Sequence, residues 1–482
     1  MKRLLTTILV SATLSAVAQD IDDVIRYSNV VTLGSAKFNS MAGALGAVGG
    51  EVSSIGYNPA SLGIFRSSQL SISPTWYDSP TKATYYDQTT KGTKSKFKLA
   101  EMGMVVVTPN EDGDGLKSFA FSFAYNRSAN LSQNIMIKGD NPYESRLDSE
   151  VATFNQDQWA GNLFYKADLF VYDSVNKIYV NDYQKAGVRG TQQAENIQSD
   201  GHIAEYVLAL GANFNDAFYF GGSMNILSVF YEQKRKYTET PFANISKNVD
   251  LHKLENIDFF RTSGAGLNMK IGMIYWLNER IRFGATLQTP TIFSFTDSYS
   301  STVVSDVYYV DTTGREYIKN NRKYTSGTSE WGLKTPARFM GSIAFVFPKR
   351  GLIDVDCEFV NYKSSTIDYH SDEYNYTNDR IVETYRSALN VRVGGEFLVG
   401  PLALRAGYAY YGSPYNRDHI NSTAHRMVYS GGLGLRWERA FFDIGYSYNT
   451  RKITYGLYNS ADSEAEIKDN SGNLSVTIGL KI

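Results

Sequence analysis

Apolar side chains alternate with small, polar or charged ones in segment after segment of this sequence, and this pattern constrains the fold more than any other feature. The last segment shows it most clearly. Its apolar positions are Leu474, Val476, Ile478, Leu480 and Ile482, and its other positions are Ser475, Thr477, Gly479 and Lys481. A period of two is the period of a β-strand, whose successive side chains point to opposite faces. The sequence therefore predicts an all-β chain.

The chemistry of the two faces distinguishes a transmembrane barrel from a soluble sandwich. One face carries charged residues such as Asp354, Glu358 and Arg392, which excludes a dry core between two sheets. The opposite face is too aromatic and too regular to lie in water, in a chain with 35 Tyr and 26 Phe. Such alternation is typical of a barrel with lipid outside and a polar lumen inside. No internal run reaches the roughly eighteen apolar residues that suggest a membrane-spanning helix.

Connection lengths support the barrel independently. The candidate strands are 68–77, 96–109, 117–132, 203–213, 217–237, 259–276, 281–297, 334–347, 352–369, 384–398, 402–413, 425–437, 440–456 and 472–482. Short and long links between them alternate without exception, as do the periplasmic turns and outer loops of bacterial barrels. An even strand count places both ends of the barrel on the periplasmic side. We therefore expect a fourteen-stranded antiparallel transmembrane β-barrel over residues 68–482.

The N-terminus predicts export. Lys2 and Arg3 precede a short apolar run, and Ala16-Val17-Ala18 forms a small-x-small cleavage site before Gln19. These features describe a secretory signal peptide over residues 1–18. We expect the protein in the bacterial cell outer membrane, in contact with its lipid. A net charge of −1 gives no indication of nucleic-acid binding.

Two regions lie outside the strand pattern. Residues 19–67 open with an amphipathic stretch and continue with small residues. The link over about 133–202 is the longest and contains a stretch, Gln192–Ile197, that we interpret as a helix. This link either folds over the barrel mouth or is a mobile surface loop, and it is a possible site for a protein partner.

A motif before the first strand resembles that of a known family. The small-residue segment and the motif are Ser40-Met41-Ala42-Gly43-Ala44-Leu45-Gly46-Ala47-Val48-Gly49-Gly50 and Ser53-Ser54-Ile55-Gly56-Tyr57-Asn58-Pro59-Ala60-Ser61-Leu62. Together they resemble the N-terminal hatch of the FadL/TodX family of hydrophobic-compound transporters. The segment Asp23–Ser28 looks like the Bacteroidetes branch of that family, whose members are often labelled hemin receptors. Resemblance in detail covers about the first tenth of the chain.

The resemblance implies a fourteen-stranded barrel whose lumen is blocked by the hatch. It also implies passive uptake of a hydrophobic small molecule, such as a long-chain fatty acid, with no cofactor. The family catches its substrate between the loops after strands five and seven, here about 238–258 and 298–332. Rearrangement of the hatch and a kink in the third strand then release it sideways into the bilayer. That strand directs Ala120, Ser122 and Ala124 inward, and it contains no Gly or Pro that would force a kink.

The gate itself is expected at Asn58, Pro59 and Ala60, with Gly43 and Gly46 beside them. Pro59 restricts Asn58 to an extended backbone, so a helix cannot continue through this point. The Asn58 amide can then satisfy backbone groups where the chain turns inside the lumen. An ordinary tight turn leading into the first strand is the other interpretation, and the two are compatible.

Strands eight to twelve bring charges of both signs to the expected lumen face. These are Arg338, Asp354, Asp356, Glu358, Arg392, Glu396, Arg405 and Arg436. Because acidic residues on strand nine lie between arginines on both neighbours, we expect a cross-strand ionic ladder. It either stiffens the wall or anchors the head group of a ligand, for example on Arg405 or Arg436.

Other chemistry finds little support. His202, His252, His370, His419 and His425 are not spaced as metal ligands, and we expect no metal site. The stretch Asn110–Gly115 resembles part of a calcium loop but lacks its distal Glu. Cys357 is expected to face lipid, and no hydrolase, zinc-protease or phosphate-loop motif occurs. The leading hypothesis is a transporter, the alternative is a barrel acting as a secretion or surface-assembly subunit, and an enzyme is the least favoured.

Overall fold

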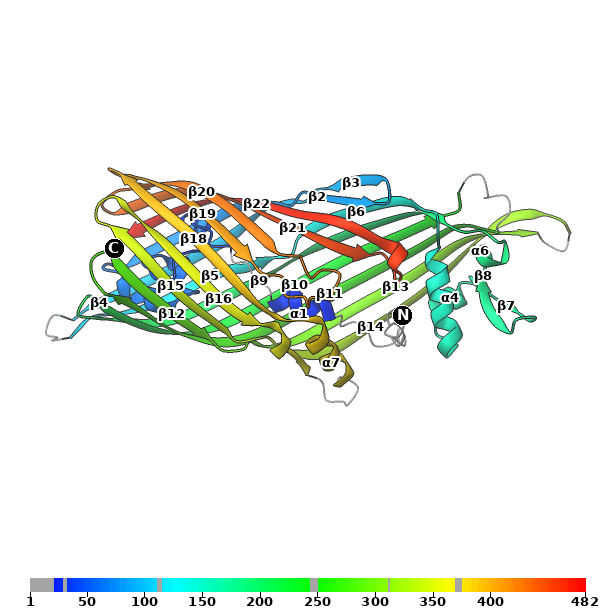
Figure 1. Ribbon diagram of the computed structural model, residues 1–482, viewed down its shortest axis with the longest axis horizontal. Coiled ribbons are helices and arrows are strands. Elements are labelled where there is room, and N and C mark those ends of the chain that lie inside the picture. The colour runs from blue at the N-terminus through cyan, green and yellow to red at the C-terminus, as the bar shows by residue number, and fades with distance from the viewer. Residues whose placement is uncertain (1–20, 29–32, 111–114, 243–249, 311–312, 369–374) are drawn as a thin grey trace, which may run out of the picture.

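The computed structural model describes residues 21–28, 33–110, 115–242, 250–310, 313–368 and 375–482. The expected signal peptide therefore lies outside the described residues. The molecule is a long, closed barrel with its C-terminus at one end and a group of helices and a hairpin beyond the other (Figure 1). None of the described helices is both long and apolar enough to cross a membrane.

Fourteen strands form the wall, and each pairs antiparallel with its neighbours. In order they are β1 (Gln69–Asp78), β4 (Ser95–Pro109), β5 (Leu116–Asn130), β9 (Thr191–Phe214), β10 (Phe218–Thr240), β11 (Leu251–Trp276), β12 and β13 (Ile281–Gln288 and Ile292–Val310), β14 and β15 (Glu316–Lys334 and Arg338–Phe347), β16 (Gly351–Asn361), β18 (Ser387–Val399), β19 (Leu402–Tyr411), β20 (Arg426–Arg436), β21 (Ala440–Gly456) and β22 (Glu464–Lys481). Pairing of β22 with both β21 and β1 closes the barrel. The fold class expected from the alternation is confirmed.

Two of these strands are each interrupted once, at a proline. Pro290 separates β12 from β13, and Pro336 separates β14 from β15. A proline has no N–H to donate to a ladder, so a strand breaks or bulges there. The two breaks lie side by side and are joined by the Thr335 N–H, which donates to the Thr291 carbonyl at 2.9 Å.

One side of the barrel is much taller than the other. Strands β9, β10 and β11 have 24, 23 and 26 residues, whereas β18, β19 and β20 have 13, 10 and 11. Most of the expected loops 238–258 and 298–332 is therefore wall. The helix expected at Gln192–Ile197 was also wrong: these residues pair with β10 from Gln192, opposite Thr240, onward. The sequence there has no clear period, and pairing with a distant strand decides its structure.

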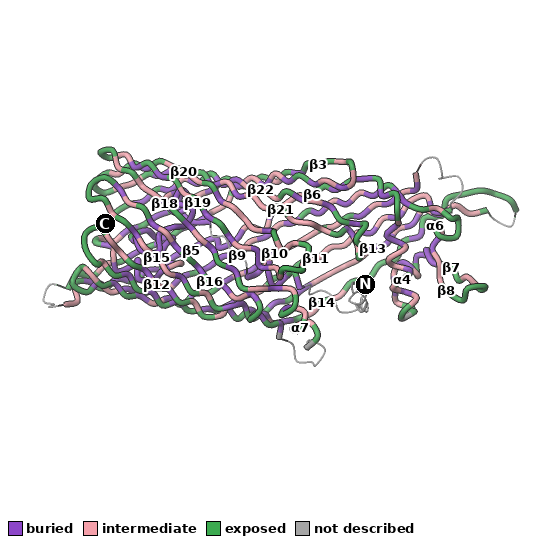
Figure 2. The backbone as a smooth tube through the Cα atoms, viewed as in Figure 1, coloured by how far each residue is buried: buried purple, intermediate pink, exposed green. Residues whose placement is uncertain are grey.

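The two faces of the wall divide as the alternation indicated. On β5, Phe119, Phe121 and Phe123 are 39–44% exposed, whereas the residues between them, Ala120 and Ser122, are buried. Cys357 is on the exposed face. Figure 2 shows exposed and buried residues alternating along the strands around the barrel. The exposed face is the one that lipid covers.

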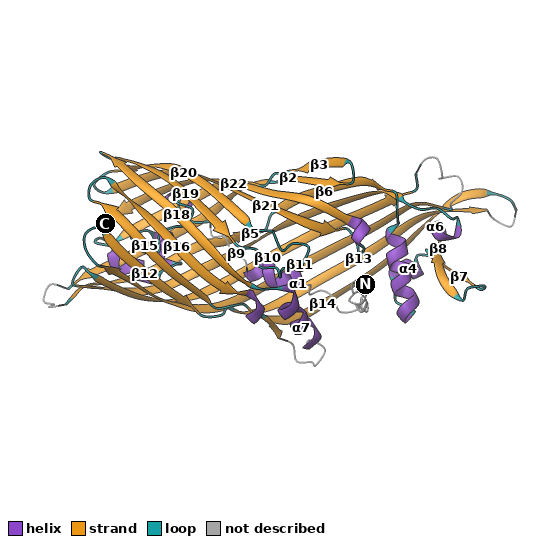
Figure 3. Cartoon of the chain, viewed as in Figure 1, coloured by secondary structure: helices purple, strands orange, loops and turns teal. Residues whose placement is uncertain are grey.

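The segment ahead of the first strand lies inside the barrel. It contains α1 (Ile21–Ser28), α2 (Ala36–Ser40), α3 (Val52–Ile55) and the 3-10 helix η1 (Pro59–Ile64), and we call residues 21–65 the hatch. Figure 3 shows its short helices within the outline of the strands. Helix α2 packs against β19 to β22, and η1 packs against β5 and β9 to β11. Side chains of α1 such as Val24 and Tyr27 are buried together with Phe295 and Trp331 of the wall.

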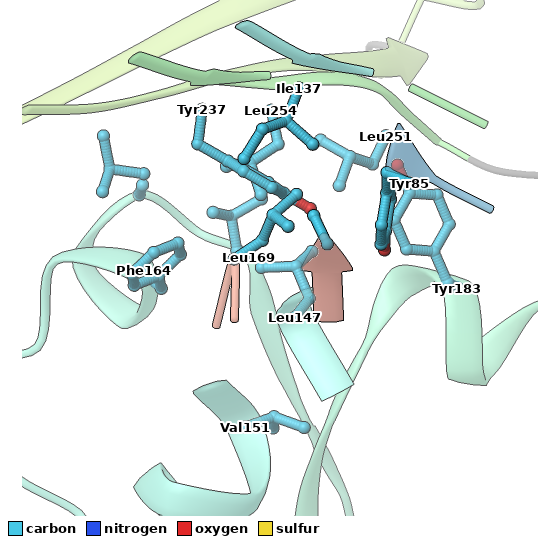
Figure 4. Packing of buried hydrophobic residues seen from close by; sticks show 14 of the residues in the cluster. Tyr85, Ile137, Leu147, Val151, Phe164, Leu169, Tyr183, Tyr237, Leu251 and Leu254 are labelled. Carbon is cyan, nitrogen blue, oxygen red and sulfur yellow. The ribbon is translucent and has the colours of Figure 1, made fainter. Parts of the chain in front are cut away.

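A folded cap covers the end with the long connections. It consists of β2 (Thr81–Tyr85), β3 (Gln88–Gly92), β6 (Gln133–Asn141), α4 (Arg146–Asp157), α5 (Leu163–Lys166), β7 (Phe170–Asp173), β8 (Ile178–Asn181) and α6 (Asp182–Lys185). Helix α4 begins at a capping box formed by Ser145 and Asp148. Its Leu147 and Val151 pack with Tyr237 and Leu254 of the wall strands (Figure 4). Shorter elements, η3 (Tyr362–Ser364), β17 (Thr366–Asp368), α7 (Asn375–Thr384) and η5 (Ala461–Ser463), complete this end.

Candidate functional site

Asn58 lies at the centre of the hatch and is fully buried. Its side-chain amide donates to the carbonyl of Gly46 at 2.8 Å and to that of Met273, in the wall, at 3.3 Å. Its side-chain oxygen accepts from the Ala60 N–H at 3.1 Å and so caps η1, whose first residue is Pro59. One side chain thus joins two parts of the hatch to each other and to the barrel.

Glycines of the wall form the seat on which the hatch rests. A Cβ added at Gly272 would lie 2.0 Å from Asn58 Oδ1, and one at Gly221 would lie 2.3 Å from the Pro59 carbonyl oxygen. Similar close approaches occur at Gly211, Gly284, Gly394, Gly407, Gly432 and Gly445. A glycine inside a strand often marks such a close backbone approach. This role was not predicted from the sequence, although glycines at inward strand positions indicated it.

Gly43 and Gly46 differ in what they do. Gly43 has a φ of +78° and terminates the turn after α2, a conformation that glycine adopts without strain. Gly46 faces the wall, where an added Cβ would lie 2.1 Å from Ser342 Oγ. The Gly46 and Ala47 N–H groups donate to Asp356 and Asp354, each at 3.2 Å. These two carboxylates therefore hold a hatch turn.

The charges of the wall form two groups. In the first, Glu358 lies 2.7 Å from Arg338 and 3.4 Å from Arg392. The Arg392 guanidinium also lies 3.5 Å from Asp356 and stacks on the ring of hatch Tyr57, 4.8 Å from its centroid. Arg338 in turn donates to the carbonyl of Ser28 in α1. This group connects the wall to both ends of the hatch.

The second group centres on Arg405. Its Nε lies 2.6 Å from Glu396, and its Nη1 lies 2.6 Å from Asp443. Arg436 also binds Asp443, at 2.9 Å. Asp443 faces the lumen between two arginines, and it was not among the charged positions predicted for the ladder.

Two ionisable side chains of the hatch, Lys37 and Glu51, are buried inside the lumen and interact electrostatically. Burial raises the pKa of the Glu51 carboxyl, and it lowers the pKa of the Lys37 ammonium group. Glu51 accepts the Ser54 N–H at the start of α3.

The wall is incompletely paired beside the third strand. Among the described residues, backbone pairing between β4 and β5 stops at Glu101 and Asn126. The register shifts at Ala100 on β4 and at Ser128 on β5, so each strand carries a bulge where the ladder stops. A β-bulge thus bends the third strand without glycine or proline.

Side chains cross the gap that this leaves. Lys98 Nζ donates to Asn130 at 2.7 Å and to Ser132 at 2.8 Å. Arg127 Nε donates to the Leu99 carbonyl at 3.0 Å. We call this stretch, 95–100 opposite 127–132, the β4–β5 gap.

A cavity of about 320 Å³ lies between α1, the β4–β5 gap and the far wall. Its apolar lining includes Ile25, Leu131, Ile135, Ile197, Ile453 and Ile467. Its polar lining includes Arg26, Arg426, Arg451 and Asp469, together with the gap residues Asn130 and Ser132. The space is amphipathic and reaches the gap on the cap side of the hatch.

Metal chemistry has no support in the described part of the chain, where no three His, Cys, Asp or Glu side chains gather to hold an ion. His202 and His252 lie in the wall strands β9 and β11, and His370 lies outside the described residues. Most of the turn at Asn110–Gly115 is likewise not described.

Comparisons with known proteins agree with this geometry. The family model for outer membrane protein transport proteins (OMPP1/FadL/TodX) matches residues 181–478. A Pseudomonas aeruginosa FadL homologue is similar with a TM-score of 0.55 at 12% identity, over 93% of this chain and 98% of the homologue. The P. putida toluene transporter TodX gives 0.53 at 10% identity, over 93% and 99%. The CymD monoaromatic hydrocarbon channel gives 0.50 at 10% identity, over 93% and 98%. At these identities the likeness is one of fold, and no curated protein sequence matches.

Proposed function

The chain belongs to the FadL/TodX family of outer membrane transport proteins, and on that premise we propose that it takes up hydrophobic compounds passively, with a preference for amphiphiles that carry an acidic head group, such as long-chain fatty acids. Residues 1–18 are proposed to be the signal peptide that directs export. The proposal includes no catalytic step and no cofactor. It rests on the amphipathic cavity next to the β4–β5 gap.

The cavity suits a ligand with one apolar and one charged end. Isoleucines and leucines from the hatch, β6, β9, β21 and β22 would cover a hydrocarbon chain, which gains about 25 cal/mol for each Å² removed from water. A fully apolar compound would leave the polar lining of the cavity without new partners. The ligand class that matches both parts of the lining is an amphiphile.

Two arginines define where the head group would bind. Arg426 and Arg451 lie directly opposite each other on β20 and β21, and both line the cavity. Like charges in this position are unfavourable. Asp469 pairs with Arg451 at 2.9 Å, so two cations face one carboxylate. A carboxylate from the ligand would balance the second arginine through a charge-assisted hydrogen bond.

The β4–β5 gap gives the ligand a route into the bilayer. It lies beside the cavity, and side chains rather than backbone pairs close it. Lateral exit keeps an apolar tail out of the aqueous periplasm, where exposure of its surface is unfavourable. The hatch region around Asn58 is instead filled by polar and charged contacts, so the proposed path leaves the lumen above the hatch.

The alternative function, a secretion or surface-assembly subunit, has one supporting observation. The β7–β8 hairpin of the cap exposes Val171, Tyr172, Val175 and Ile178. Exposed apolar groups at the tip of a cap are a feature of protein-binding surfaces. A transporter does not need them.

Uptake in a strain that lacks this protein tests the proposal. Cells with and without the chain would receive a radiolabelled long-chain fatty acid, its methyl ester and toluene. We expect the chain to restore uptake of the acid most strongly. The double variant Arg426→Gln, Arg451→Gln should lower uptake of the acid about tenfold, as expected for loss of a charge-assisted hydrogen bond, and leave the ester little changed.

Lys452→Gln is the matched control, because Lys452 follows Arg451 on β21 but is exposed. It should behave as the wild type. Equal losses for acid and ester in the double variant would contradict the head-group site. Failure to restore uptake of any of the three compounds would reject the transport function and favour the alternative.

A further inference from the structure

An ion pair buried in the lumen links the hatch to the third strand. Lys270 of β11 and Glu205 of β9 lie 2.7 Å apart, and each is at most 7% exposed. The same ammonium group donates to the carbonyl of Gly56, in the hatch just before the Asn58 motif. The other oxygen of Glu205 accepts from Ser128 Oγ at 3.3 Å.

Ser128 is an extra residue of β5 at the edge of the gap, so this chain of contacts joins the hatch to the place where the proposed path leaves the lumen. Gly56 belongs to the hatch, and Ser128 lies where the β4–β5 ladder has stopped. A Cβ at Gly56 would lie 3.0 Å from Asn126 Nδ2, on the last paired residue of β5. The hatch therefore touches the edge of the gap directly as well as through the ion pair.

A third contact supports the same connection. The Leu33 N–H of the hatch donates to the Arg127 carbonyl, next to the bulge, at 2.9 Å, and the two residues form an isolated antiparallel bridge. The hatch is thus hydrogen-bonded to the backbone of the third strand, and movement of either one would break this bond.

From these contacts we infer that Lys270 and Glu205 are positioning residues that couple the hatch to the bulge of the third strand, so that the hatch loosens and the β4–β5 gap widens together. The role of this coupling in transport rests on the proposed function, but the coupling itself can be measured in the protein without substrate. Small cavities of the lumen favour such motion: one of about 70 Å³ is lined by Gly56, Ser128, Glu205 and Lys270.

Hydrogen–deuterium exchange of the full-length protein, purified in detergent micelles without substrate, tests the coupling. The two segments to follow are 52–58 in the hatch and 127–133 at the bulge. The double variant Lys270→Met, Glu205→Gln removes both charges, so no unpaired charge remains buried. We expect exchange to rise about tenfold or more in both segments, from the loss of a charge-assisted hydrogen bond.

Ser128→Ala perturbs the other end with the loss of one hydroxyl group, which the barrel should tolerate. Coupling is reciprocal, so this variant should also raise exchange in 52–58. Lys270→Arg keeps the cation and should restore exchange close to that of the wild type. The control Arg261→Met, Glu232→Gln removes an exposed ion pair between β10 and β11, and it should change neither segment.

Several results would overturn the inference. In either variant, a rise confined to one of the two segments would show that hatch and bulge move independently. No change in either segment would show that the ion pair positions nothing. The uptake experiment is separate: its failure would remove the proposed function, whereas coupled exchange would still show that the two parts move together.

Discussion

At the residue scale, the hatch fits against the wall because several wall positions are glycines, which have no side chain. Asn58 and Pro59 can approach β10 and β11 only because Gly221 and Gly272 carry no side chain. The Asn58 motif was recognised in the sequence, whereas its glycine seat was missed although inward glycines marked it. The adjacent residues Gly221 and Gly222 of β10 differ in this respect. Gly221 contacts the hatch, whereas a Cβ added at Gly222 would have its nearest contact at 3.8 Å.

Gly221→Ala should therefore lower the melting temperature and increase protease cleavage within the hatch. The added methyl group would meet the Pro59 carbonyl at 2.3 Å, and overpacking of this kind destabilises by roughly 1–3 kcal/mol. Gly222→Ala, on the other face of the same strand, should leave both measurements near the wild-type values. Equal effects of the two substitutions would contradict the seat.

At the element scale, the third strand departs from a regular strand at two residues, Lys117 near its start and Ser128 beside the gap. Arg127 pairs with Ala204 and Ala129 pairs with Ile203, so Ser128 is the extra residue. Beyond the bulge, the partners of β5 and β6 on β9 continue in one register. The bulge therefore bends the strand away from β4 without disturbing the outer part of the wall.

Deletion of Ser128 should straighten β5, because residues 129–141 can keep their partners on β9. The straightened strand could then pair with β4, and the gap would close. We expect a folded barrel, measured by its heat-dependent migration in gels, with strongly reduced uptake of the compounds that the wild type transports. Unchanged uptake by this variant would rule out exit through the β4–β5 gap.

At the scale of the whole molecule, the closed wall and the inserted hatch are structurally distinct parts. The wall is closed by the β1–β22 ladder without any hatch residue. Contacts of the hatch, such as Ala36 N–H to Thr477 at 2.7 Å and Ser430 Oγ to the Ser40 carbonyl at 2.9 Å, add to it from inside. The hatch lies inside the lumen, and the cap packs against the tall strands at the mouth.

Deletion of residues 21–65 should leave a barrel that inserts into membranes but conducts ions. A fourteen-stranded barrel is wide enough to hold water once its plug is removed. Current across a planar bilayer measures this directly, and the full-length protein should stay closed under the same conditions. A truncated barrel that is folded yet silent would mean that the cap, rather than the hatch, seals the lumen.

The sequence by itself determined the class of fold, the number of strands, the face that each strand turns to lipid, and the family motif at Asn58-Pro59-Ala60. These properties are local: a period of two, a short turn or a short sequence motif can be recognised without knowing the neighbours. The charges on the lumen face were recognisable for the same reason.

Only the tertiary structure decided which of those residues meet. Asn58 binds Met273, which is 215 positions away, and Ala36 binds Thr477, which is 441 positions away. The extra height of β9 to β11, the bulge at Ser128 and the Lys270–Glu205 pair depend in the same way on strands that closure of the barrel brings together. No local pattern encodes such contacts, because their free energy comes from partners that only the folded barrel supplies.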